Sequence, residues 1–156
     1  MGWNVPLILV PKTPDERIEY RDRTVTIPTG SSWEDIRAII DTIGKRIMPG
    51  ATVTIQLEDG TYSFDLTTSN APFLLKDFWG GGELVLQGNP SDNGVQLAKN
   101  VVLSGDCGGS NGHLRLIHVD NCRTPIYIKY FKCYLTNPGQ AEWNNGVHIS
   151  NSLEPN

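Results

Sequence analysis

The sequence predicts an all-β protein made of short stacked strands, with one amphipathic helix near its start. Of its 156 residues, 16 are glycine and 10 are proline, while hydrophobic residues make up 38%. This composition favours many short strands joined by turns over long helices. One stretch has the alternation of a strand, and another has the period of a helix. The length is that of a single domain with a substantial core.

Residues 1–30 are predicted to be an approach and attachment segment that precedes this fold. Three prolines keep its first 14 residues irregular or extended. From Arg17 to Ile27 apolar residues alternate loosely with polar ones, and Arg21-Asp22-Arg23 lies where a hairpin tip is expected. This charged tip is either a docking patch for another protein or a solvated edge that discourages aggregation.

The spacing of apolar residues predicts one helix over Ser31–Ile47. Ser31 and Glu34 fit a capping box, and Lys45 and Arg46 suit the last turn before Pro49-Gly50 ends the helix. The apolar residues recur every three or four positions: Trp33, Ile36, Ile40, Ile43 and Ile47. We expect this stripe to be buried against the strand that follows.

That strand is the clearest in the chain. Val53, Ile55 and Leu57 alternate with polar residues, which is typical of a strand with one solvated face. Asp59-Gly60 then predicts a turn, because glycine accepts a positive φ. Extended structure resumes over Thr61–Phe64, and we expect Tyr62 and Phe64 to share one face.

After Glu83 the sequence predicts brief strands that end in polar turn residues. The apolar members of these strands lie at Leu84–Leu86, Val95–Leu97, Val101–Leu103, Leu114–Val119, Ile126–Ile128, Tyr134–Leu135 and Val147–Ile149. The intervals between them, such as 19 positions from Leu116 to Leu135 and 30 from Leu86 to Leu116, are those of a solenoid. Coils of roughly 20–30 residues would give about four coils from Ala51 onward.

These features resemble the opening of a right-handed parallel β-helix of the pectate-lyase-like (pectin lyase-like) type, and in particular phage tailspike and tail-fibre β-helices. The resemblance rests on the helix at Ser31–Ile47, on the strand and D-G-T-Y turn at Val53–Tyr62, and on the later strand-and-Asn units. It covers residues 31–156, which would then hold a capping helix and a short stack of coils.

The resemblance implies a virion tail component, made in the bacterial cytoplasm, that is structural or binds host-surface polysaccharide. It also implies a homotrimer, with the N-terminal segment contacting other tail proteins. The alternative is a polysaccharide lyase or hydrolase whose site is completed between subunits.

Charge and composition exclude several other classes. The net charge is −4 without a Lys/Arg run, which argues against nucleic-acid binding, and no apolar run approaches transmembrane length. No signal peptide is evident. The three cysteines, Cys107, Cys122 and Cys133, have no CxxC spacing and are expected to be free thiols. We expect no metal and no cofactor.

The catalytic candidates are weak. Sugar hydrolysis needs paired carboxylates, and Asp106, Asp120 and Glu142 are the residues that neighbouring coils could bring together. The simpler interpretation is that such carboxylates accept hydrogen bonds from nearby turn amides. His118 alternates with apolar residues and is expected to face solvent.

The glycan-binding candidates are Trp143, Asn144 and Asn145, in a predicted loop that is too polar to be buried in the core. An aromatic ring covers the apolar face of a sugar while amides bond its hydroxyls. A loop tryptophan also suits packing against a second subunit. Trp79, close to Phe78, is assigned to the core.

The oligomer prediction depends on the last coil. No second amphipathic helix follows Val147–Ile149, and four aromatic residues crowd a short segment: Tyr127, Tyr130, Phe131 and Tyr134. Association of subunits would bury this surface. We therefore expect a trimer with Tyr130, Phe131 or Trp143 near the subunit contacts.

Overall fold

The computed structural model describes residues 17–92, 100–110, 112–139 and 144–151. In this part of the chain one α-helix, α1 (Trp33–Asp41), and one 3-10 turn, η2 (Pro90–Asp92), accompany twelve strands. The strands are β1 (Ile18–Glu19), β2 (Arg23–Ile27), β3 (Arg46–Ile47), β4 (Thr52–Leu57), β5 (Gly60–Asp65), β6 (Phe73–Lys76), β7 (Glu83–Gln87), β8 (Val101–Asp106), β9 (Arg115–Asp120), β10 (Ile126–Lys129), β11 (Lys132–Thr136) and β12 (Asn145–Ser150). The predicted dominance of β structure is confirmed.

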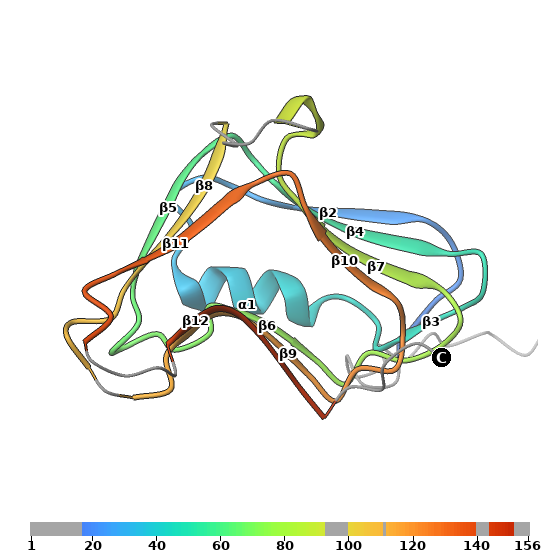
Figure 1. Cartoon of the computed structure of the whole chain (residues 1–156). Helices are drawn as coiled ribbons and strands as arrows, with labels where there is room; N and C mark the ends of the chain where they lie inside the picture. Colours follow the sequence, from blue (N-terminus) through green and yellow to red (C-terminus); the bar gives the residue numbers. More distant parts are fainter. Residues whose placement is uncertain (1–16, 93–99, 111, 140–143, 152–156) are drawn as a thin grey trace, which may run out of the picture.

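All strand pairing in the described chain is parallel. Three sheets have the orders β10-β7-β4-β2, β11-β8-β5 and β12-β9-β6, and β1 pairs with β3. The successive triples β4-β5-β6, β7-β8-β9 and β10-β11-β12 each give one strand to each of the three sheets. In Figure 1 these sheets form the three sides of a triangle, and α1 is seen between them. This topology is compatible with a β-helix-like fold.

The stack has fewer turns than the sequence suggested. Three triples are described instead of about four coils, because paired positions lie roughly 30 to 44 residues apart, as in Thr24↔Thr54 and Phe73↔Ile117. Six of the seven brief strands expected after Glu83 are present as β7 to β12, and the unit at Val95–Leu97 lies outside the described residues. The strand β6 was not predicted.

The core is built from apolar ladders that run through the stack. Val25 pairs with Ile55, Ile55 with Leu86, and Leu86 with Ile128. The first three of these residues and Val53 are buried, as the alternation in β4 predicts. Because parallel in-register strands place identical faces above one another, each apolar position covers the one in the preceding turn.

The corner between β4 and β5 fits the sequence prediction. Gly60 has a φ of +143°, and Tyr62 and Phe64 are both buried. The Tyr62 hydroxyl lies 2.8 Å from the Ile27 carbonyl oxygen and 3.0 Å from that of Glu58. Burial raises the pKa of this phenol, so it remains a hydrogen-bond donor at neutral pH.

The helix is shorter than predicted at both ends. Its capping box is formed by Ser32 and Asp35, one residue later than the expected pair, and the helix ends with Thr42 as its C-cap. Ile43 and Ile47 are buried as expected, but they lie beyond the helix, and Ile47 belongs to β3. The apolar spacing therefore continues past the helix because the segment after α1 and the strand β3 face the same core as the helix.

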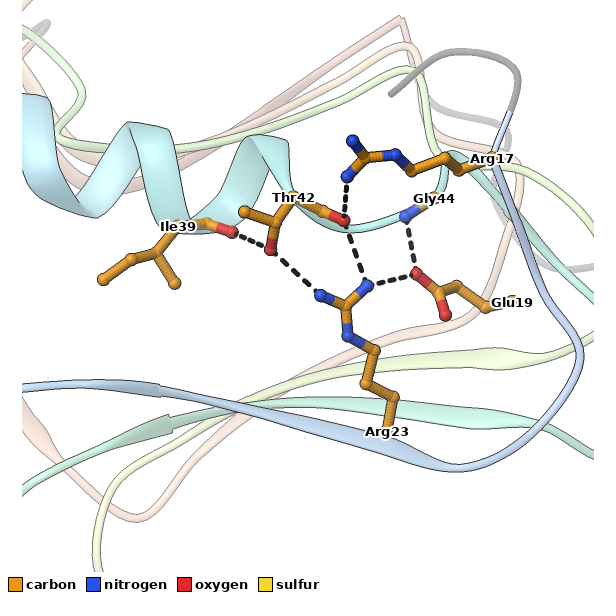
Figure 2. Close-up of polar contacts among 6 residues, drawn as sticks. All are labelled: Arg17, Glu19, Arg23, Ile39, Thr42 and Gly44. Carbon is orange, nitrogen blue, oxygen red and sulfur yellow. Dashed lines mark hydrogen bonds and ion pairs between the residues drawn. The ribbon is translucent and has the colours of Figure 1, made fainter. Parts of the chain in front are cut away.

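A polar cluster explains where the helix ends (Figure 2). Arg17 and Arg23 each donate to the Thr42 carbonyl oxygen at 3.0 Å, and Arg23 also donates to the Glu19 carboxylate at 2.7 Å. The same carboxylate accepts the backbone N–H of Gly44 at 2.7 Å. Cations at a helix C-terminus are favoured by the exposed carbonyl groups there. Arg23 thus joins β2 to the end of α1.

This arrangement corrects the hairpin expected around Arg21-Asp22-Arg23. The strands on either side, β1 and β2, do not pair with each other, because β1 pairs with β3 and β2 pairs with β4. The Asp22 carboxylate accepts the backbone N–H of Thr52 at 2.9 Å, so the segment is held against the start of β4.

One face of α1 lies against the edge of the sheets. The helix contacts β2 and β6, the end strands of two sheets, and Ile36 and Ile40 are buried there. Arg37 donates to the carbonyl oxygens of Asn70 and Ala71 at 2.7 and 2.9 Å. No helix in the described residues has the length and apolar character needed to cross a membrane.

The opposite edge of the sheets is formed by β10, β11 and β12. Val147 and Ile149 occupy register positions above the buried Ile117 and Val119, yet they are 42% and 64% exposed. Tyr127 and Tyr134 are exposed on the outward faces of β10 and β11. This end of the described fold therefore displays apolar surface.

Candidate functional site

The most distinctive surface feature lies at the corner that follows β6. The Trp79 backbone N–H donates to the Lys45 carbonyl oxygen at 2.8 Å, and the Ile47 N–H donates to the Trp79 carbonyl oxygen at 2.8 Å. Bridge pairing then places Arg46, Trp79 and Arg123 one above another in three successive segments. Since Ile47 and Phe78 occupy the buried neighbouring positions, this ladder faces outward.

The assignment of Trp79 to the core is wrong. Its side chain is 44% exposed, whereas Phe78 is fully buried. The alternation of inward and outward side chains shifts by one residue here, because Asp77 has a φ of +61° and changes the direction of the backbone. The Arg46 guanidinium lies 4.7 Å from the Trp79 ring centroid, a cation–π contact that fixes the ring at the surface.

A hollow opens beside this tryptophan. It has a volume of about 410 Å³ and is lined by Lys45, Asp77, Trp79, Asn121 and Arg123. A second hollow of about 230 Å³ shares two of these residues and is lined by Arg37, Asp41, Lys45, Leu74, Lys76 and Asp77. We call the first hollow, with Arg46 on the ring of its tryptophan, the Trp79 groove. Its size is within the range of small-molecule sites.

Polar groups in the Trp79 groove are held in place by the stacking of segments. Asp77 and Asn121 follow β6 and β9, and the Asn121 side-chain amide donates to the Asp77 carboxylate at 2.7 Å. The buried Lys45 ammonium lies 4.2 Å from the Phe78 ring centroid and 4.0 Å from the Asp41 carboxylate. An exposed indole beside a carboxylate, an amide and a guanidinium offers the contacts that a sugar ring with hydroxyl groups requires.

The sequence contains a signal for this groove that hydrophobic alternation does not report. Asp77-Phe78-Trp79 and Asn121-Cys122-Arg123 follow the same pattern, a polar residue with positive φ, then a buried residue, then an exposed one. Short Asn or Asp residues adopt left-handed conformations readily. Their recurrence after two strands of one sheet marks a corner at which side chains of successive turns meet.

The predicted glycan-binding residues are placed differently. Trp143 lies outside the described residues. The Asn144 amide donates to the carbonyl oxygens of Ser110 and Pro138 at 3.0 and 2.6 Å, and its oxygen accepts the Leu114 N–H at 3.0 Å. Asn145 begins β12, where its backbone N–H donates to the Leu114 carbonyl at 2.9 Å. Asn144 is therefore already engaged in joining two turns.

The candidate catalytic carboxylates are not brought together by any described contact. Asp106 ends β8 and Asp120 ends β9, in two different sheets, and Glu142 lies outside the described residues. Asp106 accepts the Gly108 backbone N–H at 2.9 Å and the Asn137 amide at 3.0 Å, and these bonds lower its pKa. This is the turn-stabilising role that the simpler interpretation predicted.

Asp120 belongs to a hydrogen-bond network on the outer face of β9 and β12. The Ser150 hydroxyl donates to Asp120 at 2.9 Å and lies 2.9 Å from the His118 Nε2. Bonds from Asn151 and Ser150 lower the pKa of Asp120. His118 lies on the outward side of β9, as expected, but is half-buried, and its ring centroid is 5.2 Å from that of His148. Burial, with the Arg115 charge, lowers the pKa of His118.

The described residues contain no group of three or more His, Cys, Asp or Glu side chains suited to a metal ion. Cys107, Cys122 and Cys133 are free thiols. Burial raises the pKa of all three, to about 11 for Cys133, which suppresses the reactive thiolate form.

Comparison of the chain with protein-family models, with curated proteins and with solved structures finds no match. The Trp79 groove and the parallel strand topology are therefore the observations from which a function is inferred.

Proposed function

We propose that this chain is a carbohydrate-binding structural protein of the tail-fibre or tailspike type, and that the Trp79 groove is its glycan site. The exposed Trp79 in a hollow that polar side chains also line is the observation that supports binding. In this proposal the protein is made in the bacterial cytoplasm and is assembled into a virion tail, and the segment 1–30 contacts other tail proteins.

The proposed architecture is a short right-handed parallel β-helix whose first turn is covered by α1. The regular order of the three strand triples supports the winding. The position of α1 beside β2 and β6, with Ile36 and Ile40 buried, supports the covering role. A helix at this place would shield apolar side chains and unpaired strand edges from water.

Binding is favoured over glycoside hydrolysis by the electrostatics of the carboxylates. A hydrolytic pair needs one carboxyl group with a raised pKa to donate a proton to the leaving oxygen. The pKa values of Asp106 and Asp120 are both lowered by hydrogen bonds to their ionised forms. Neither of these two residues is thus suited to the role of general acid.

Binding to a glycan array, followed by titration calorimetry of the strongest ligand, tests the proposal. Trp79→Ala should weaken binding by about 5- to 150-fold, since one stacked ring accounts for roughly 1–3 kcal/mol. Thr61→Ala, a change on the exposed face of β5 in a different sheet, should leave binding unchanged.

Three results would count against this proposal. Binding that survives Trp79→Ala but is lost in Trp143→Ala would place the site at Trp143, Asn144 and Asn145, as the sequence predicted. Release of reducing ends or unsaturated products from bacterial capsular polymers would instead establish the lyase or hydrolase alternative. Silence of the whole array would refute carbohydrate binding.

The proposed assembly is a homotrimer. Exposed Tyr127, Tyr134 and Ile149 provide apolar surface that association would bury, and Tyr130 and Phe131 lie between the two tyrosines. Sedimentation equilibrium at low micromolar concentration should give three times the chain mass. A single species of 17.2 kDa would refute the trimer.

A further inference from the structure

We infer that the ligand of the Trp79 groove is an acidic sugar, and that Arg123 binds its carboxylate group. This inference rests on the proposed carbohydrate function and adds to it the chemical class of the ligand. It follows from the local charge of the groove and from which of its cations already have partners.

The groove is positively charged although the protein is not. The chain has a formal net charge of −4, yet the larger hollow is lined by Lys45 and Arg123 against one carboxylate, Asp77. Arg46 adds a further cation on the Trp79 ring. The smaller hollow also has more cations than carboxylates. A local excess of positive charge on an acidic protein favours an anionic ligand.

Most cations around the two hollows are already engaged. Lys45 is buried between the Asp41 carboxylate and the Phe78 ring. Lys76 lies 3.9 Å from the Asp120 carboxylate. Arg37, in the smaller hollow, donates to two backbone carbonyl oxygens and covers the Trp33 ring. Each of these three cations therefore already has a partner within the chain.

Arg123 differs from them. Its side chain is exposed and lines the larger hollow. Its guanidinium group makes no hydrogen bond or ion pair with the residues that the structure describes. Its backbone is nevertheless fixed, because its N–H donates to the Phe78 carbonyl oxygen at 2.7 Å and it bridges to Trp79. A guanidinium group on a rigid backbone suits two parallel hydrogen bonds to a carboxylate.

The neighbouring groups complete a site for one sugar unit. Trp79, one segment below Arg123, offers an apolar ring, and Asp77 with Asn121 offers an acceptor and amide for hydroxyl groups. The acid group of a uronate-type sugar would then lie toward Arg123 while its ring lies along the indole. Because Asp77 would repel that acid group, the carboxylate is expected on the Arg123 side of the groove.

The test uses a glycan array that contains neutral and carboxylated oligosaccharides, probed with the whole chain. The strongest acidic ligand is then compared by calorimetry with the same oligosaccharide after its carboxyl groups have been reduced to alcohols. We expect carboxylated glycans to dominate the bound set and carboxyl reduction to weaken binding at least about tenfold, the effect of losing one charge-assisted pair.

Variants separate this inference from the proposed function. Arg123→Gln should bring the acidic ligand down to the affinity of its reduced form, whereas Trp79→Ala should weaken both forms. Lys132→Gln, which removes one exposed charge on β11, should change neither. Equal binding of acidic and neutral forms to the wild-type protein, or an unchanged preference in Arg123→Gln, would overturn the inference while leaving carbohydrate binding intact. An array without any bound glycan would overturn both.

Discussion

Replacement of Ile40 tests whether α1 is essential to the fold. Ile40 is 1% exposed and lies on the face of α1 that packs near β2 and β6. Truncation to alanine leaves a cavity in a packed interior, which costs about 2–5 kcal/mol. For a chain of this length each kcal/mol lowers Tm by roughly 2–4 °C. Ile40→Ala should therefore melt about 4–20 °C below the wild-type protein.

Ile40→Asp should have a larger effect. The variant loses the same packing and also places a carboxylate within the buried apolar cluster. Burial of an unpaired charge, or its neutralisation, costs several kcal/mol more. Since the total stability of a domain is about 5–15 kcal/mol, this variant should be largely unfolded at 25 °C.

Ala38→Asp is the matched control, because Ala38 is exposed on the same helix. It introduces the same residue at a cost of about 0.5–0.7 kcal/mol in helix propensity. Urea and thermal unfolding, followed by far-UV circular dichroism, measure all three variants. If Ile40→Asp melts together with Ala38→Asp, α1 is not packed on the sheets as described.

Three further outcomes are expected. Gly80→Ala should destabilise the fold by roughly 2 kcal/mol more than Gly109→Ala in urea unfolding. Both glycines have a positive φ, but of the two only Gly80 would place a Cβ against the Ile47 carbonyl oxygen. Equal losses of stability would argue against that close approach. The lowered pKa of His118 means that the folded state favours neutral imidazole, so its stabilisation is present above the unfolded pKa of about 6.5 and is lost as pH falls. The advantage of wild type over His118→Gln in urea midpoint should accordingly grow from pH 5 to 7.5, and parallel profiles would contradict it. Cys133, whose pKa is raised to about 11, should react with iodoacetamide at pH 8.5 far more slowly in the native than in the urea-unfolded protein, as measured by mass spectrometry. Similar rates would contradict the raised pKa.

The strand pattern was predictable where one period persists. Val53, Ile55 and Leu57 face the core because alternate side chains of a strand point to one side. The end of the helix was not predictable in the same way. Ile43 and Ile47 continue the helical spacing, but they are buried from a turn and from β3, and burial alone does not distinguish these origins.

The groove was not predicted because the alternation of inward and outward side chains shifts by one residue at a corner. Leu75 faces inward, and strict alternation would bury the next odd position, but Asp77 is in the left-handed region and the following inward residue is Phe78. Trp79 is thereby turned outward. The same slip occurs at Asn121. Such slips depend on backbone conformation, which hydrophobic periodicity does not report.

The connection 88–100 between β7 and β8 has a practical consequence for protein engineering. The corresponding connections 58–59 and 130–131 have two residues each, yet β8 pairs in register with both β5 and β11. Within the longer connection, Asp92 is held to Asn100, since the Asp92 carboxylate accepts the Asn100 backbone N–H and side-chain amide at 3.1 and 3.0 Å. A foreign peptide spliced between these two residues would be displayed from a closed stem without disturbing the register of the sheets. This corner is therefore a suitable graft point, because residues can be added to the sequence there while the paired strands on either side keep their register.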